Sequence, residues 1–232
     1  MSPTIHPSTL RFLKALAAHN DRTWFSEHQE AYGAARTNVI SFVDALIARM
    51  REHDQLDTWS GKSSLYRINN DLRFSPDKSP YQPRFAGYLR RAKPLLRGGY
   101  YWWIKPGASR VSCGFAHPDP ADLLRIRLDI RDQHDVWQRL LRNAAIRRHF
   151  GTMQGDKVKT TPRGFDADDP AIALLRYRQF WFTRSFTDAE VLAPDFLTQV
   201  NKTFRSIRPF FDHVSEVLTT DLNGEPRVTP RS

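Results

Sequence analysis

With 232 residues, the chain is long enough to bury roughly 70 to 75% of its unfolded surface, so its core needs no disulfide or metal. Hydrophobic residues make up 40% and aromatic residues 12%, which excludes disorder over most of the length. The formal net charge of +10 favours polyanionic partners, but the arginines are spread along the chain among acidic residues, as is also typical of a solvated basic surface.

Cysteine usage and the N-terminal sequence indicate the compartment. Cys113 is the lone cysteine, so no intramolecular disulfide can form, which suits a reducing environment. Met1 to Pro7 lacks the basic and then apolar layout of a signal peptide, and no run of about eighteen apolar residues occurs. We therefore expect a cytoplasmic protein that is neither exported nor membrane-spanning.

The N-terminal part is predicted to be helical. Ser8 and Thr9 offer a cap for a short helix that ends near His19 and Asn20. From Trp24 to Met50, apolar residues recur at spacings of three and four, which predicts a long amphipathic helix.

Strand signals gather in the middle of the chain. Pro106 and Gly107 suit the two central positions of a type II turn, which predicts a hairpin between the segments on either side. The predicted strands are Ser64–Ile68, Arg84–Arg90, Tyr100–Lys105 and Arg110–Phe115, with a further one at Gln179–Phe186.

Helices return in the second half. Asp119 or Asp122 can cap one helix, and a second is predicted from His134 to His149, with arginines opposite its apolar face. A long ordered loop from Gly151 to Asp169 follows. The remaining predictions are a short helix at Ala171–Arg176, a final helical region from a Thr187–Asp188 cap to about Thr219, and a frayed tail beyond Asn223.

This order of elements predicts the fold class. Strands clustered between helical ends argue against βαβ alternation and favour an α+β fold, with a central, mostly antiparallel sheet flanked by helices. Because no linker or repeat divides the chain, we expect one domain over residues 1–232, ordered from about 5 to 222. The sequence does not indicate an oligomeric state.

The segment from Arg67 to Tyr81 is the most unusual part of the sequence. Arginine forks suit phosphate or carboxylate oxygens, and prolines stiffen the loop that carries them. We expect a small-molecule or anion site, whose predicted ligand-binding residues are Arg67, Asp71, Arg73, Asp77, Lys78 and Tyr81, joined by Lys159 and Arg163 from the second loop. Asp71 and Asp77 would orient the cations or act as general base, but an equally good interpretation is that Arg–Asp pairs merely close the loop.

Other patterns are weaker. No nucleophile–base pair is visible, so no catalytic residue is assigned and the question of an enzyme stays open. Scattered histidines predict no metal site, and no glycine-rich cradle predicts a nucleotide cofactor. The arginine face of residues 134–149 suggests nucleic-acid binding as an alternative, and a structural or interaction module is the third. For Tyr100 to Trp103, packing in the core is favoured over base stacking.

Three stretches of the chain resemble a known family. Asn20–Phe25, Asp71–Tyr81 and Lys159–Phe165 are similar to the conserved hypothetical proteins catalogued as domain of unknown function 2461. The resemblance covers nearly the whole chain, and it implies no established reaction, ligand or catalytic residue. Two departures stand out: Asn70 takes the place of an expected arginine, and Ser112–Phe115 replaces a more glycine-rich stretch.

Overall fold

A computed structural model describes residues 3–71, 73, 78–221, 225 and 227. In these residues, eleven helices and a four-stranded sheet confirm the predicted α+β class. The chain divides into two compact units of three segments each. Unit 1 takes residues 1–89, 101–111 and 185–202, and unit 2 takes residues 90–100, 112–184 and 203–232.

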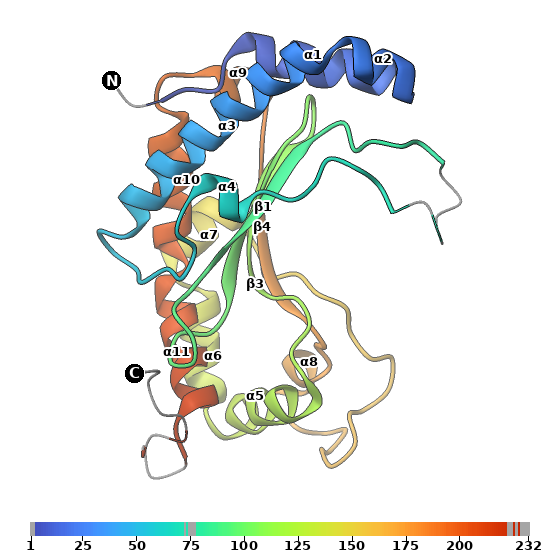
Figure 1. The fold of residues 1–232 in the computed structure, drawn as a ribbon. Coiled ribbons are helices and arrows are strands. Elements are labelled where there is room, and N and C mark those ends of the chain that lie inside the picture. The colour runs from blue at the N-terminus through green and yellow to red at the C-terminus, as the bar shows by residue number, and fades with distance from the viewer. Residues whose placement is uncertain (1–2, 72, 74–77, 222–224, 226, 228–232) are drawn as a thin grey trace. The chain divides into compact units, whose positions relative to one another are not determined.

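The sheet contains the predicted central strands. Strands β1 (Phe85–Arg90), β2 (Gly99–Ile104), β3 (Ser109–Phe115) and β4 (Phe180–Phe186) lie in the order β1-β2-β3-β4 (Figure 1). Between β2 and β3, Gly107 takes a φ of 69°, and the Ala108 amide donates to the Lys105 carbonyl over 2.9 Å. Glycine adopts this left-handed conformation at no steric cost, so the predicted turn is confirmed.

Unit 1 contains the N-terminal helices α1 (Pro7–Ala18), α2 (Arg22–Glu27) and α3 (Gln29–Met50). The predicted helix from Trp24 to Met50 is therefore interrupted at His28. There the imidazole stacks on Trp24 at 3.9 Å, and its Nδ1 donates to the Trp24 carbonyl over 2.8 Å. Apolar residues recur at helical spacing on both sides of the break, so the sequence pattern alone does not reveal it.

The predicted strand at Ser64–Ile68 is wrong. Ser60 and Ser63 form a reciprocal capping box that starts a short helix, α4 (Gly61–Ser64), packed against α3. Beyond it the chain pairs only through single bridges, Leu65 with Gly87 and Asn69 with Tyr81. Two isolated contacts do not make a ladder, and the segment between them is irregular.

Two further helices are associated with unit 1. Thr187 and Glu190 form the capping box of α9 (Asp188–Leu192), as the predicted cap required. The helix α10 (Phe196–Ser206) follows, and most of its residues belong to this unit. Phe196 stacks on Phe42 of α3 at 5.3 Å and meets Phe186 of β4 edge-on at 5.2 Å, which builds an aromatic core in unit 1.

Unit 2 contains α5 (Pro120–Asp132), α6 (His134–Leu141), α7 (Ala144–Phe150), α8 (Ile172–Leu175) and α11 (Arg208–Thr219). Asp119 caps α5, as one of the two predicted alternatives required. Helix α11 packs against α5 and α6, and its Phe210 contacts Trp137 at 5.7 Å. Residues 151–169 form no helix or strand, as predicted, but bridge to the rest of the unit at Gln154 and Lys157.

The described helices do not meet the length and hydropathy that a membrane span requires. None of them is both long and apolar enough to cross a bilayer.

Candidate functional site

The 67–81 motif is closed at its base by backbone pairing within unit 1. The Asn70 amide donates to the Pro80 carbonyl over 2.9 Å, and the Gln82 amide donates to the Ile68 carbonyl over 2.7 Å. The two ends of the motif are therefore held together. A loop fixed at its base can hold polar groups in place for a ligand.

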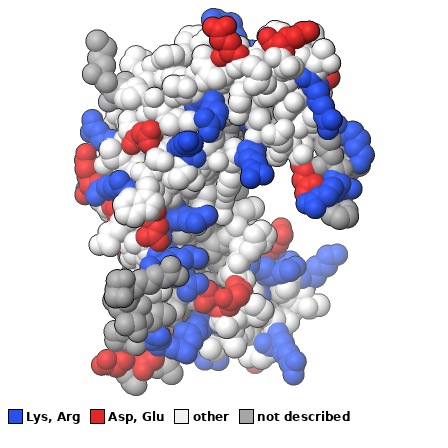
Figure 2. All heavy atoms as spheres, viewed as in Figure 1, with Lys and Arg blue, Asp and Glu red and all other residues white. Residues whose placement is uncertain are grey.

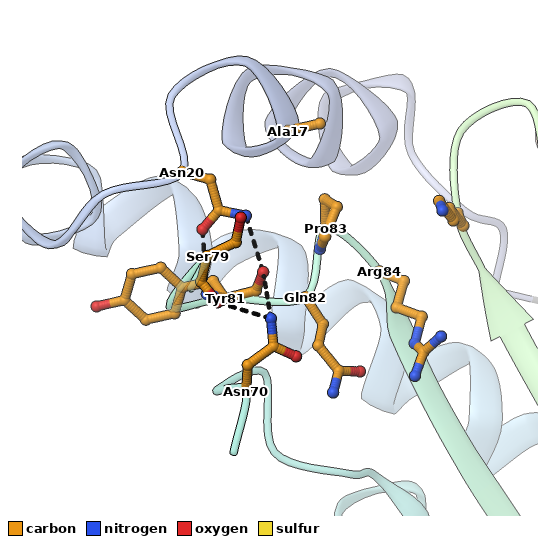
Figure 3. A pocket seen from close by; sticks show the side chains of 9 residues that line it. Ala17, Asn20, Asn70, Ser79, Tyr81, Gln82, Pro83 and Arg84 are labelled. Carbon is orange, nitrogen blue, oxygen red and sulfur yellow. Dashed lines mark hydrogen bonds between the residues drawn. The ribbon is translucent and has the colours of Figure 1, made fainter. Parts of the chain in front are cut away.

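Two asparagine side chains reinforce this base. Asn20, which follows α1, accepts from the Tyr81 amide over 3.0 Å and donates to the Tyr81 carbonyl over 2.8 Å. Asn70 donates to the Ser79 carbonyl over 2.8 Å and to the Tyr81 carbonyl over 3.3 Å. Figure 3 shows these contacts meeting at Ser79 and Tyr81, on the segment by which the motif returns toward β1. Each side chain satisfies backbone groups that a neighbouring strand would otherwise have to pair.

Tyr81 contributes to this region mainly through its backbone. Its ring is buried and stacks on Phe25 at a centroid distance of 3.9 Å. In Figure 3 the ring points away from Gln82 and Arg84. The predicted ligand-binding phenol is thus an anchor that attaches the motif to α2.

The described charged residues of the predicted motif site are exposed. Asp71 and Arg73 form a bidentate ion pair, with the Arg73 Nη2 2.7 Å from the Asp71 Oδ2. The side-chain hydrogen bond from Arg73, followed by its backbone N–H, lowers the pKa of the Asp71 carboxyl. Arg67 and Lys78 are exposed as well. The paired charges agree with the alternative in which Arg–Asp pairs help to hold the loop.

Three predicted site residues lie elsewhere. Asp77 lies outside the described residues. Lys159 and Arg163 belong to unit 2, where both are exposed. Their participation in a site with the motif stays a prediction.

A hollow of about 410 Å³ lies at the base of the motif, within unit 1. It carries two cations and no carboxylate, and its other polar groups are amides and a hydroxyl. The lining residues are Ala17, Asn20, Asn70, Ser79, Tyr81, Gln82, Pro83, Arg84 and Lys105. Figure 3 shows the Gln82 and Arg84 side chains projecting from the same side of the segment that leads into β1.

Arg84 is the electrostatically unusual residue of this hollow. Its guanidinium lies 5.9 Å from the centre of the Trp103 ring, and that of Arg110 lies 4.6 Å from the same ring. Burial, and secondly the charge of Arg110, lower the pKa of Arg84. In the part of the chain that the structure describes, neither arginine forms an ion pair with a carboxylate.

Two hydrogen-bond donors in this cluster are buried without a partner among the described residues, the Arg84 Nε and the Trp103 Nε1. A buried donor left unpaired costs about 1 to 3 kcal/mol, and more when the group is charged. Two like charges on one ring add a repulsion that an anion would relieve. We term Arg84, Trp103 and Arg110 the arginine–tryptophan cluster.

The arginine-rich segment of residues 134–149 is not one helix, which corrects the prediction. It breaks after Leu141, and the Asn143 side chain caps α7 by accepting from the amides of Ala145 and Ile146. The four arginines, Arg139, Arg142, Arg147 and Arg148, are exposed but are distributed over two helices and their connection. Figure 2 shows lysines and arginines interspersed with acids across the visible face.

Thiol and metal chemistry find little support in the described residues. Burial raises the pKa of the Cys113 thiol well above its ordinary value, which disfavours the thiolate that nucleophiles and metal ligands require. No group of three His, Cys, Asp or Glu side chains in the described ranges is arranged to hold a metal ion.

Sequence reasoning missed most residues of the hollow. Among the described members of the predicted ligand-binding set, only Tyr81 lines it, and the prediction did not include Asn20, Gln82, Arg84 or Lys105. A signal was present: Arg84, Trp103 and Arg110 stand at or beside three predicted strands that a meander would place side by side. The hairpin alone predicts that Trp103 and Arg110 become neighbours.

The chain was then compared with known proteins. A family model described as "Conserved hypothetical protein (DUF2461)" matches residues 8–213. No curated protein and no solved structure matches the chain.

Proposed function

We propose that this chain, which belongs to that family of conserved hypothetical proteins, binds a small anion in the hollow. Arg84 and Lys105 would supply positive charge, and the Gln82 side chain a hydrogen bond. The observation that carries this proposal is the pairing of Arg84 with Arg110 on one indole ring without a carboxylate.

Structural arginines are normally paired, because a partly buried cation without a counter-charge loses hydration and gains nothing in return. Here burial and Arg110 both act against the charged form of Arg84. A phosphate or carboxylate in the hollow would offset both effects, since it adds a counter-charge beside the Arg84 guanidinium and accepts hydrogen bonds from it.

The lining of the hollow favours an anion over a neutral apolar ligand. Apolar ligands need largely hydrophobic walls, whereas this hollow presents amide, hydroxyl and cationic groups. Asn20 and Asn70 already donate to backbone carbonyls, so their role is to hold the wall in shape. Recognition would fall to Gln82, Arg84 and Lys105.

Calorimetric titration with inorganic phosphate, pyrophosphate and citrate at low salt tests this proposal. Arg84→Gln should weaken binding of the preferred anion at least tenfold, because charged hydrogen bonds contribute about 1.5 to 3 kcal/mol each. Arg73→Gln is the matched control, since that arginine is exposed and already paired with Asp71. Its affinity should stay within about twofold of the wild type, as expected for a residue outside the hollow.

The same titrations can overturn the proposal. Loss of affinity in Arg73→Gln with none in Arg84→Gln would transfer the site to the charged residues of the motif. Failure of all three anions to bind the folded wild-type protein would remove anion binding altogether. Circular dichroism of each variant establishes that it is folded.

A further inference from the structure

The four aromatic residues from Tyr100 to Trp103 divide between the two faces of β2. Tyr100 is 0% exposed and Trp102 3% exposed, so both belong to the core. Tyr101 and Trp103 are half-buried, as the alternation of side chains along a strand requires. The prediction that these residues pack in the core therefore holds for Tyr100 and Trp102 only.

Tyr101 and Trp103 continue a stack of rings in unit 1. Tyr88 of β1 stacks on Tyr101 at 4.3 Å with an interplanar angle of 26°, and Tyr101 stacks on Trp103 at 6.2 Å with an angle of 24°. We term Tyr88, Tyr101 and Trp103 the aromatic ladder. Its rings are nearly parallel and partly accessible, so that a planar group can join the stack.

The ladder ends beside Arg84, one cation of the proposed anion site. Trp103 is at once a ring of the ladder and the indole beside Arg84 and Arg110. Flat rings next to guanidinium groups that have no carboxylate partner among the described residues match a ligand that carries both planar bases and phosphates. Inorganic anions use only the charged end of this arrangement.

From this juxtaposition we infer that the ligand is single-stranded nucleic acid, with bases stacked on the aromatic ladder and phosphates at the arginine–tryptophan cluster. The inference rests on the proposed function, because Arg84 serves both. A duplex keeps its bases stacked inside, whereas an open strand presents them to protein rings without sequence preference. The net charge of +10 adds a favourable long-range field for such a polyanion.

Fluorescence anisotropy of labelled oligonucleotides tests the inference. Twelve-residue thymidine or uridine strands should bind at low salt, and binding should weaken steeply as salt rises because phosphate contacts release counterions. A duplex of equal length should bind at least tenfold more weakly. Tyr101→Leu should reduce single-strand affinity about tenfold, within the range for one lost stacking ring.

A second tryptophan provides the matched control. Trp59 is 83% exposed and has the Arg51 guanidinium 5.9 Å from its ring, but it belongs to neither the ladder nor the hollow. Trp103→Leu should therefore lower oligonucleotide affinity at least tenfold, while Trp59→Leu leaves it within twofold. Equal losses in both variants would show that any exposed ring suffices and would overturn the inference.

The two proposals fail in distinguishable ways. Tyr101→Leu should keep the wild-type affinity for pyrophosphate, since Tyr101 does not line the hollow. Arg84→Gln should weaken the binding of both pyrophosphate and the oligonucleotide. Pyrophosphate binding without oligonucleotide binding would overturn the inference and leave the anion site standing. Binding of a mononucleotide as tight as that of the twelve-residue strand would replace the polymer with a free nucleotide. Absence of both activities would remove both proposals.

Discussion

Two arginines of this protein contrast at the level of single residues. Arg91 is fully buried, and its guanidinium donates to the Arg97 carbonyl, the Ser215 hydroxyl and the Asp212 carboxylate, at 2.9, 3.1 and 2.9 Å. Arg84 is partly buried beside another cation, with its Nε unpaired in the described structure. Arg91, whose hydrogen bonds are made within the fold, has the pattern of a structural residue. Arg84, whose Nε has no partner in the described structure, has the pattern of a binding residue.

Arg91→Ala should lower the free energy of unfolding by about 3 kcal/mol, because it removes a buried charged network and opens a cavity beside Phe211. Arg208→Ala is its control. Arg208 pairs with the same Asp212 at i, i+4 on α11 and should contribute about 0.5 kcal/mol. Urea unfolding measures both, and equal losses would contradict a structural role specific to Arg91.

At the level of elements, glycines show where the fold tolerates a side chain. Gly114 of β3 has a φ of 141°, and a Cβ there would lie 2.1 Å from the Phe180 carbonyl oxygen of β4. Gly33 lies in the second turn of α3 and is exposed, with nothing within 4 Å of an added Cβ. Gly114 is required because the two strands approach closely there. Gly33 meets no such need, and it costs the helix backbone entropy on folding.

The two positions should therefore respond to alanine with opposite signs. Gly33→Ala should raise the free energy of unfolding by about 0.5 to 1 kcal/mol, the difference in helix propensity. Gly114→Ala should lower it by at least about 3 kcal/mol, since strain and a backbone clash combine. Thermal and urea unfolding measure the stability of the two variants. A change of the same sign in both variants would contradict this account.

The elements that sequence predicts well are those fixed by local chemistry. Pro106 and Gly107 fix the hairpin, and the Thr187 capping box fixes the start of α9. The interruption at Asn143 was missed because hydrophobic periodicity continues across it, even though asparagine is a favoured cap. For the site, charge density in the motif drew attention to Arg73, whereas the unpaired state of Arg84 depends on tertiary contacts that no local pattern encodes.

At the level of the whole molecule, each strand contributes to both compact units. The boundary crosses β1 after Leu89, β2 after Tyr100, β3 after Val111 and β4 after Arg184. A domain that folds by itself normally has boundaries in exposed linkers. The prediction of one domain over residues 1–232 follows this logic and remains to be tested.

Calorimetry should accordingly give one unfolding transition, with equal calorimetric and van't Hoff enthalpies. Far-ultraviolet circular dichroism and tryptophan fluorescence should report the same midpoint, because neither unit can keep its strands once the other has melted. Two resolved transitions, or an intermediate that retains half of the helical signal, would divide the chain into separate domains.

The single bridges beside the sheet have a consequence for behaviour at high concentration. In the order β1-β2-β3-β4 the outer strands are β1 and β4, and both are met by another segment of their own chain, at Leu65–Gly87 and Gln154–Trp181. An unpaired outer strand is a template on which a second chain can add its own, the first step of edge-to-edge aggregation. These short contacts occupy part of each template, so they leave less of each outer strand open to pairing with a second chain.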